Sequence, residues 1–534
     1  MATNARYEFV LIASNETRVV SFDDYESWSR LVIAAGAVKG EEPKQRSEVR
    51  GDAKVQVAEL RTGATFADAV TTMEQETGER FPSMWPTVVE EPPDTLLSFE
   101  QRFPDALPAP DDPLSDEAID SAESPDSLEA ALAAPDDVVA ISRFSLDTLP
   151  DELTQFPRLR TFSARIDDAT LPGPLANLPL LRRIWIGGYT HRLTSEIGLL
   201  TALRELSTRG IESLPAEIGA LRMLRELEIR YGSIVDLPLE IGYLIELARL
   251  TVDHCALERL PPSLARLKKL RILELASNRL RALPTALGTL EALEFLDVSY
   301  NPVGALPESI GELATLHTLK AVKCGLSELP ATIANCESLR VLELALNTLT
   351  ASAFDALVST SIESLDLRDV AIPDNARLPT TLTSLRWSAL GFDQCTLPCA
   401  ILEASRLSRL DLEHAGLCEL PDALFDLPLR SLNLGFNKDV VLPDSIRRLS
   451  GLEFLSLYAL ELTEVPDVLA SLPIQKLHLG ANRRIERLPE WLHTMPTLRE
   501  LCIGDSVPRE ERDRFIEARP DVKLLSWMST DPIA

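Results

Sequence analysis

The chain has 534 residues and a formal net charge of −29, from 82 acidic and 53 basic side chains. This excess of carboxylates disfavours general affinity for DNA or RNA, because phosphate binding requires clustered Lys and Arg. Hydrophobic residues make up 45% of the chain, which is enough for a large core, yet the length exceeds that of one ordinary compact domain.

Cysteines and apolar runs bear on the cellular compartment. The seven cysteines are scattered and form no paired clusters. The first residues lack a basic region followed by a long apolar run, and no stretch approaches the roughly 18 apolar residues of a membrane span. We therefore expect a cytoplasmic protein that does not bind membranes.

Residues 1–88 predict a small α+β domain. Apolar residues of strand type occur at 7–12, 18–22 and 54–60, and residues 66–73 have helical spacing. The order of Ser14-Asn15, then Trp28-Ser29-Arg30, then Gly36, resembles a degenerate WGR domain. Some members of that family bind nucleic acid, but this segment is acidic and has Ser at the middle position of its tripeptide. An unrelated small sheet with Trp28 in its core is the alternative.

Residues 89–140 predict an acidic, proline-rich linker. Between residues 90 and 137, 15 Asp and Glu and eight Pro accompany one basic residue, Arg102. Such a segment repels itself and has few apolar side chains to bury. It is either an extended spacer, in part draped over its neighbours, or an acidic mimic that inserts into a basic groove.

A repeat of 21 to 23 residues dominates residues 141–507 and gives about 16 coils. It reads L-x-x-L-x-L-x-x-N-x-L-x-x-L-P, as at 270–284, and returns at 293–307 and 316–330. The pattern resembles leucine-rich repeats of the intracellular Ras-group or plant type. That resemblance implies an α/β solenoid, a horseshoe with a parallel sheet on its concave face.

Each repeat position has a predicted role. In Leu270-x-x-Leu273-x-Leu275 the leucines alternate with polar residues, so the leucines point into the core of a strand layer. Asn278 and its equivalents can satisfy both N–H and C=O groups where the chain leaves the strand. Pro284 pre-sets the first helical turn on the convex side. The ladder position is filled by Asn278, Asn301, Asn347, Asn437 and Asn482, with Cys255 and Cys324 as substitutes.

Two regions depart from the regular repeat. Spacing becomes irregular between 353 and 397, which predicts a bend or an inserted loop. Residues 508–534 predict a C-terminal cap, in which a charged helix turns Phe515 and Ile516 inward and a last strand covers 522–525.

Motifs for catalysis are missing from the sequence. It contains no G-x-x-x-x-G-K-[ST] loop and no H-E-x-x-H, and its histidines fall in different coils. Cys395 and Cys399 lack the spacing of a zinc site. We therefore expect a protein that is not an enzyme, with no catalytic residues, no cofactor and no metal.

The outward residues of the strands form the candidate binding surface. In nine successive coils the residue between two strand leucines is Glu228, Thr251, Glu274, Asp297, Lys320, Glu343, Asp366, Arg386 and Asp411, of which six are acidic. Neighbouring side chains of this row lie about 5 Å apart. Flanking residues enlarge the surface: Trp185, Arg230, Tyr231, His254, Tyr300 and Arg368.

These features predict a non-enzymatic scaffold that binds a protein or peptide with a basic segment on the concave face. Alternatively, the polar row only keeps the strands soluble. Two other functions remain open at this point: a nucleic-acid-associated or regulatory protein with a WGR-like head, and a bacterial effector that acts in a host cell.

Overall fold

The computed structural model describes strand backbone at 7–13, 16–22, 44–50 and 53–59. From there on it describes residues 99–103, 110, 112, 114–167, 169–188, 190–389, 396–438, 440–504 and 506–526. The chain divides into two compact units, Met1–Ser98 and Phe99–Ala534. Within the described residues, no helix is both long enough and apolar enough to span a membrane.

The first unit contains one sheet in the order β2-β1-β4-β3. Strands β1 (Tyr7–Ala13) and β2 (Glu16–Phe22) are antiparallel, as are β3 (Lys44–Arg50) and β4 (Ala53–Glu59), while β1 and β4 are parallel. The predicted strands coincide with β1, β2 and β4, whereas β3 has too few apolar residues to be recognised from sequence. Trp28, Gly36 and the predicted helix at 66–73 lie outside the described residues.

The second unit is a solenoid with one strand per coil. Pairing is parallel from each strand to the next along the chain. The strands are β5 (Ala140–Leu146), β6 (Thr161–Ile166), β8 (Arg183–Ile186), β10 (Glu205–Arg209), β11 (Glu226–Arg230), β12 (Arg249–Asp253), β13 (Ile272–Glu274), β14 (Phe295–Asp297), β15 (Thr318–Lys320), β16 (Val341–Glu343), β17 (Ser364–Arg368), β18 (Ser384–Ser388), β19 (Arg409–Asp411), β20 (Ser431–Asn433), β21 (Phe454–Ser456), β22 (Lys476–His478), β23 (Glu500–Ile503) and β24 (Lys523–Ser526). Two short strands, β7 (Ala169–Leu171) and β9 (Thr190–Leu193), form a separate parallel pair.

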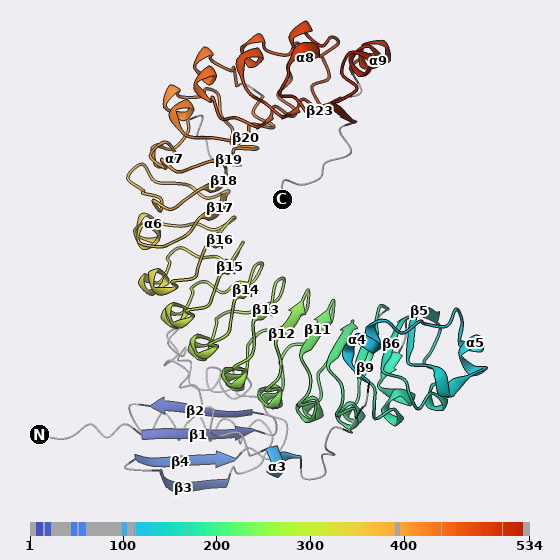
Figure 1. Cartoon of the computed structure of the whole chain (residues 1–534). Coiled ribbons are helices and arrows are strands. Elements are labelled where there is room, and N and C mark those ends of the chain that lie inside the picture. Colours follow the sequence, from blue (N-terminus) through green and yellow to red (C-terminus); the bar gives the residue numbers. More distant parts are fainter. Residues whose placement is uncertain are drawn as a thin grey trace, which may run out of the picture. The chain divides into compact units, whose positions relative to one another are not determined.

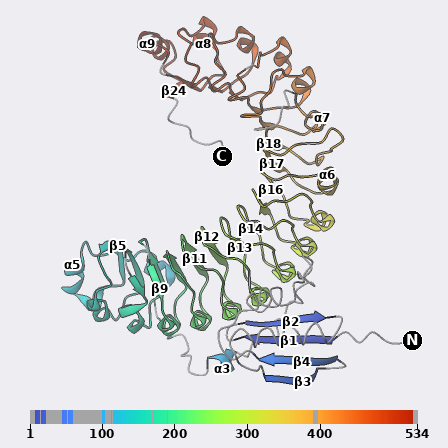
Figure 2. The same cartoon turned by 180° about the vertical axis from the view of Figure 1, so that it is seen from behind.

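Short helices connect the strands of the coils. In this unit the strands line the inner side of the curve, and helices such as α6, α7 and α8 lie on its outer side (Figures 1 and 2). The 3₁₀ helices are η2 (Pro135–Asp137), η3 (Asp151–Gln155), η4 (Gly173–Asn177), η5 (Ser195–Leu199), η6 (Ala216–Ala220), η7 (Leu239–Tyr243), η8 (Pro262–Arg266), η9 (Thr285–Thr289), η10 (Glu308–Glu312), η11 (Ala331–Asn335), η12 (Asp422–Asp426), η13 (Asp444–Arg448) and η14 (Asp467–Ser471). The α-helices are α3 (Phe99–Arg102), α4 (Asp116–Asp120), α5 (Leu128–Leu132), α6 (Ala351–Val358), α7 (Cys399–Leu402), α8 (Glu490–Thr494) and α9 (Arg509–Ala518).

The proline of the repeat has a different role from the predicted one. Pro284 is the N-cap of η9 in an extended conformation (φ −67°, ψ 147°), one residue before the helix, rather than part of its first turn. Pro307 and Pro330 do the same for η10 and η11. The helix that follows Pro284 has only five residues and is of the 3₁₀ type, which is common for short helical pieces.

Buried asparagines hold successive coils together, as the sequence predicts. The Asn278 Nδ2 donates to the carbonyl oxygens of Val252 (2.7 Å) and Leu275 (2.9 Å), and its Oδ1 accepts from the Leu257 N–H (3.1 Å). Asn301, Asn347, Asn437 and Asn482 make the same set of bonds. Each asparagine thereby satisfies backbone groups of two coils that water cannot reach.

Leucines of the repeat form one continuous core. Leu270, Leu273 and Leu275 are each fully buried, and the same is true of their equivalents along the array. The glycines of the outer side permit close contact between coils, because a Cβ added at Gly311 would lie 2.4 Å from the Thr332 carbonyl oxygen. Gly219, Gly242 and Gly288 meet the next coil in the same way.

The irregular coils between 353 and 397 use other side chains in place of asparagine. Val370 stands at the ladder position, and the indole N–H of the buried Trp387 donates to its carbonyl oxygen (3.0 Å). Helix α6 replaces a 3₁₀ helix in the preceding coil. Residues 390–395 lie outside the described part of the chain.

The C-terminal cap contains α9 and β24. Phe515 is fully buried, as predicted, and packs near His493 with ring centroids 5.3 Å apart. Ile516 was expected to face inward but is 47% exposed. The two residues are adjacent on α9, so a helix that turns Phe515 to the core must direct Ile516 about 100° away from it.

Candidate functional site

The predicted row of outward side chains forms as expected at the level of the backbone. Pairing is in register from Glu228 to Thr251, on to Glu274 and Asp297, and without interruption to Asp411. Because parallel strands lie about 4.8 Å apart, the side chains of this row are close neighbours. We call it the strand row.

Much of the acidic charge in the strand row is neutralised within the protein. The Arg230 Nε lies 2.5 Å from the Glu228 Oε1, and the Lys320 Nζ lies 3.2 Å from the Glu343 Oε1. Glu274 accepts a hydrogen bond from the Thr251 hydroxyl (2.6 Å). These contacts relieve the repulsion that a column of carboxylates would otherwise cause.

Asp366 and Asp411 are the most enclosed acids of the row. The Asp366 side chain is only 4% exposed, because Arg368 lies over it with its Nη2 2.7 Å from the Oδ2. The charged groups exposed at this point are therefore Arg368 and Arg386 rather than Asp366. Burial is the main cause that raises the pKa of Asp411, partly offset by the backbone N–H of Glu413.

Asp297 uses its carboxylate to close a turn. Its Oδ1 accepts the backbone N–H of Ser299 at 2.9 Å, where the chain leaves β14. Its side chain is half-buried. Of the predicted acids, Asp297 and Glu274 lie at the middle of the row and stay partly open to solvent.

Large exposed aromatic side chains flank the strand row. Trp185 on β8 is 39% exposed, and Tyr231 and Tyr300 at strand exits are 48% and 50% exposed. The Tyr231 ring lies 5.0 Å from the ring of His254, and the Arg209 guanidinium is 5.8 Å from the Tyr231 ring centroid. Exposed aromatics beside charged groups are typical of the energetic centres of protein interfaces.

Backbone geometry explains why these side chains point outward. Tyr231, His254 and Tyr300 have φ of 55°, 50° and 57°, in the left-handed region. Each directly precedes a ladder position, where the chain turns sharply so that the next side chain can enter the core. The left-handed conformation is uncommon for residues other than glycine, so the turn imposes it.

A second aromatic group was not recognised as a unit from the sequence. The rings of His414 and Phe436 stack at 4.0 Å, Phe436 lies 5.0 Å from Tyr458, and Tyr458 lies 5.0 Å from His478. Burial is the main cause that lowers the pKa of His478. The signal in the sequence is an aromatic residue or histidine near the strand exit of each of these coils.

The described residues also bear on metal binding and on thiol reactivity. The described residues contain no group of three or more His, Cys, Asp or Glu that could hold a metal ion. Burial raises the pKa of the Cys324 and Cys336 thiols to about 11, which leaves them protonated and unreactive at neutral pH.

Comparisons with known proteins identify the repeat. Residues 262–359 match the family model of a leucine-rich repeat region. No curated protein sequence matches the chain. Neither finding supports a WGR domain in residues 1–88.

Several solved structures match the chain. One is a leucine-rich repeat protein of Leptospira interrogans, 26% identical over 76% of this chain and 99% of that chain, with a TM-score of 0.49. Another is an internalin of Listeria monocytogenes, 19% identical over 60% of this chain and 87% of that chain, with a TM-score of 0.44. A third is the Arabidopsis receptor kinase HAESA in complex with a peptide hormone and a co-receptor, 18% identical over 69% of this chain and 75% of that chain, with a TM-score of 0.42.

Proposed function

We propose that this leucine-rich repeat protein is a non-enzymatic scaffold that binds a protein or peptide partner on the strand face of its solenoid. Each coil adds one strand and one outward side chain, so the array offers a long, regular surface rather than a closed catalytic cavity. The partner lies across several coils and is recognised by side chains from each.

The observation that carries this proposal is the set of exposed aromatics beside the strand row. Trp185, Tyr231 and Tyr300 are 39%, 48% and 50% exposed, and such large aromatic residues are enriched where proteins bind one another. Rings of this size lose little conformational entropy on binding and bury a large area. We therefore assign the anchoring contacts to these three residues.

The charges of the strand row fit a partner with a basic segment. Glu274 and Asp297 occupy neighbouring coils and are paired in register. A Lys or Arg of the partner would displace the weaker internal contacts, such as the 3.8 Å approach of Arg249 to Glu274. Such rim charges contribute orientation and speed of association more than affinity.

The anchor residues can be tested by differential co-purification. We expect Tyr231→Ala/Tyr300→Ala in the full chain to lose a partner that the unchanged chain retains. The matched control is Leu199→Ala/Leu239→Ala, which removes two equally exposed apolar side chains (51% and 46%) from helices η5 and η7 of the outer side. A partner retained by the tyrosine variant, or lost from both variants, would contradict binding on the strand face.

The charge preference is tested on the partner so identified. Glu274→Lys/Asp297→Lys is expected to weaken its binding about tenfold or more at low salt, and less at high salt. Unchanged affinity would show that the acidic residues of the strand row serve only solubility.

A further inference from the structure

A column of arginines runs along one edge of the first coils. The residue directly before each strand donates its backbone N–H to the carbonyl of the same position in the preceding coil, at 2.7 to 2.8 Å from Arg182 to Arg225. In four successive coils this residue is arginine: Arg160, Arg182, Arg204 and Arg225. We call this column the arginine ladder.

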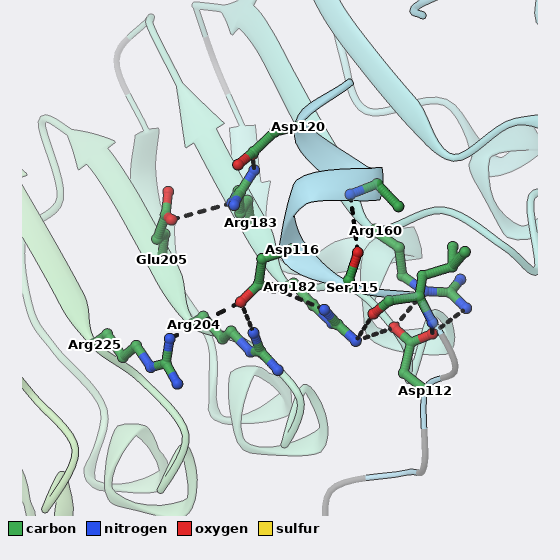
Figure 3. A network of polar contacts seen from close by, with 12 residues as sticks. Asp112, Ser115, Asp116, Asp120, Arg160, Arg182, Arg183, Arg204, Glu205 and Arg225 are labelled. Atoms are coloured by element: carbon green, nitrogen blue, oxygen red, sulfur yellow. Dashed lines mark hydrogen bonds and ion pairs between the residues drawn. The ribbon is translucent and has the colours of Figure 1, made fainter. Parts of the chain in front are cut away.

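Asp112 and residues 114–120 of the same chain, which we call the acidic segment, occupy the arginine ladder (Figure 3). The Asp112 Oδ2 lies 2.7 Å from both the Arg160 Nε and the Arg182 Nη2. Asp116 bonds to Arg182 at 2.8 Å, contacts Arg204, and lies 4.0 Å from Arg225. Each carboxylate therefore bridges arginines of successive coils.

The segment is also fixed by its helix and by a third carboxylate. Ser115 caps α4 by accepting the Ala118 N–H at 3.1 Å, and Asp120 pairs with Arg183, which also contacts Glu205 at 3.1 Å. These groups lie on the same side of the first coils as the arginine ladder (Figure 3).

Exposure along the arginine ladder follows the position of the segment. The side chains of Arg160 and Arg182 are 3% and 6% exposed, Arg204 is 22% exposed, and Arg225 is 51% exposed. Burial works to raise the pKa of Asp112, yet the hydrogen bond and charge of Arg160 hold that pKa below its usual value. The segment thus covers Arg160 and Arg182 almost completely, covers Arg204 in part, and leaves Arg225 the most exposed.

Other coils neutralise the same position in a different way. Arg271 pairs with Glu294, which occupies this position in the next coil, through two hydrogen bonds of 2.8 Å. Arg340 is likewise paired with Glu363 at 3.5 Å, and Arg430 with Glu453 at 3.3 Å. The array therefore has a local means of balancing an arginine here, and the first coils do not use it.

Four like charges in one column are unfavourable without an external anion. Burial, and after it the charge of Arg182, lowers the pKa of Arg204, which reflects this repulsion. The Nη1 of Arg160 is buried and has no hydrogen-bond partner, so the segment does not satisfy every donor of the ladder.

Apolar contacts contribute little to holding the segment. In α4 only Ile119 is buried, and the other side chains are polar or small. The charged contacts therefore supply most of the attraction. Salt weakens the contacts of the partly exposed Asp116 and Asp120, which can be exchanged for equivalent ones, more than it weakens the buried pair of Asp112 and Arg160.

We propose that the arginine ladder is a binding site for an acidic segment of a partner protein, and that the chain's own Asp112 and residues 114–120 occupy this site in the absence of the partner. The site differs from the strand row in its residues and in the charge it selects, so it does not depend on the function proposed above. A partner reaches the ladder by displacing the chain's own segment.

The occupying segment indicates the chemistry of the ligand. Asp112 and Asp116 are four residues apart and contact overlapping pairs of arginines. Asp112 precedes the extended N-cap Ser115 and Asp116 is the first residue of α4, so the two carboxylates lie on a stretch that leads into a helix. A segment with two carboxylates four residues apart copies this ligand, and guanidinium groups bind such carboxylates with directed hydrogen bonds.

The test uses the full chain with Asp112→Asn, Asp116→Asn and Asp120→Asn. The probe is a labelled synthetic peptide that copies residues 108–124. We expect fluorescence anisotropy at low salt to show that the variant binds this peptide at least about tenfold more tightly than the unchanged chain, and that about 500 mM NaCl reduces the difference. Adding Arg204→Glu to the variant should abolish binding, because it recreates the alternation seen at Arg271 and Glu294.

Two controls separate recognition from general charge effects. Asp355→Asn/Asp374→Asn/Asp444→Asn changes the net charge equally at exposed sites elsewhere and should bind no more peptide than the unchanged chain. The proposal is overturned if the control variant binds the peptide as tightly as the variant with Asn at 112, 116 and 120. It is also overturned if the latter binds no more tightly than the unchanged chain. Equal binding of a single-stranded oligonucleotide of the same charge would overturn the assignment to acidic protein segments.

A second measurement needs no variant and covers the case in which the substituted chain does not fold. Hydrogen exchange at residues 114–122 of the unchanged chain should accelerate about tenfold or more between about 50 and 500 mM NaCl, while strands β10 and β11 stay protected. Exchange that is independent of salt would show that the segment is a fixed part of the core, and would overturn the proposal.

Discussion

At the scale of single residues, a periodic sequence predicts the contacts of side chains whose partners lie at regular intervals along the chain. Asn278 bonds to Val252, Leu257 and Leu275, and the same offsets recur at Asn301 and Asn347. At Asn437 and Asn482 the two longer offsets are one residue shorter. Asp366 could not be predicted in the same way. Its burial depends on the conformation of the long side chain of Arg368, which the repeat pattern does not determine.

The glycines of the outer side allow neighbouring coils to approach closely, so their substitution tests this contact. Gly311→Ala is expected to destabilise the array by about 1–3 kcal/mol, because its Cβ would lie 2.4 Å from the Thr332 carbonyl oxygen and the backbone of the next coil must move. Gly451→Ala is the matched control, since the nearest atom to its Cβ is 4.0 Å away. Urea unfolding measures both, and equal stability of the two variants would contradict close coil contact at Gly311.

At the scale of elements, the strands were predictable and the place of the acidic segment was not. Composition shows that residues 90–137 are charged, but the column that receives Asp112 and Asp116 appears only when coils 21 to 22 residues apart are stacked. In the sequence, Arg182 and Arg204 each look like an ordinary polar residue before a strand. The sequence predicts a helical turn after Pro284 but not its 3₁₀ type, because Leu287 and Leu290 fit the spacing of either kind of helix.

The docked segment should respond to acid in a defined window. Burial works to raise the pKa of Asp116, but the charge of Arg204 and the hydrogen bond of Arg182 lower that pKa below its usual value. The carboxylates of the docked segment thus bind fewer protons than those of the free one. Docking is fully stabilised above about pH 3.9, the pKa of a free aspartate. This stabilisation is lost as the pH falls through the lowered pKa of the docked Asp116.

Hydrogen exchange, corrected for its intrinsic pH dependence, measures this effect. Residues 116–120 should keep constant protection from pH 7 to 5 and lose it below about pH 4. Helix α5, which is capped by Ser127 and buries Ala131, serves as the reference. Protection of α4 that persists to pH 2 would mean that Ile119, rather than the carboxylates, holds the segment.

At the scale of the whole molecule, each coil is stabilised mainly by its two neighbours. Leu273→Asp places a charge where the side chain is fully buried, and is expected to cost about 4 kcal/mol or more. Because the core is shared, protection from hydrogen exchange should be lost in β12, β13 and β14 together, while distant strands retain it. Arg279→Asp adds the same carboxylate at an exposed position of the same coil and should change stability by less than about 0.5 kcal/mol. An unchanged melting temperature for Leu273→Asp would contradict the assigned register.

The covalent connection between the acidic segment and the first coil sets a threshold for any competitor. A group joined by a short linker is present at its own site at an effective concentration of the order of millimolar. An acidic peptide that binds the vacant ladder with a dissociation constant of about 1 μM would therefore compete as though it bound about a thousandfold more weakly. Isolated acidic stretches at cellular concentrations would not displace the segment, whereas a partner that also binds elsewhere on the array would displace it. The segment thereby makes occupation of the arginine ladder conditional on a second contact.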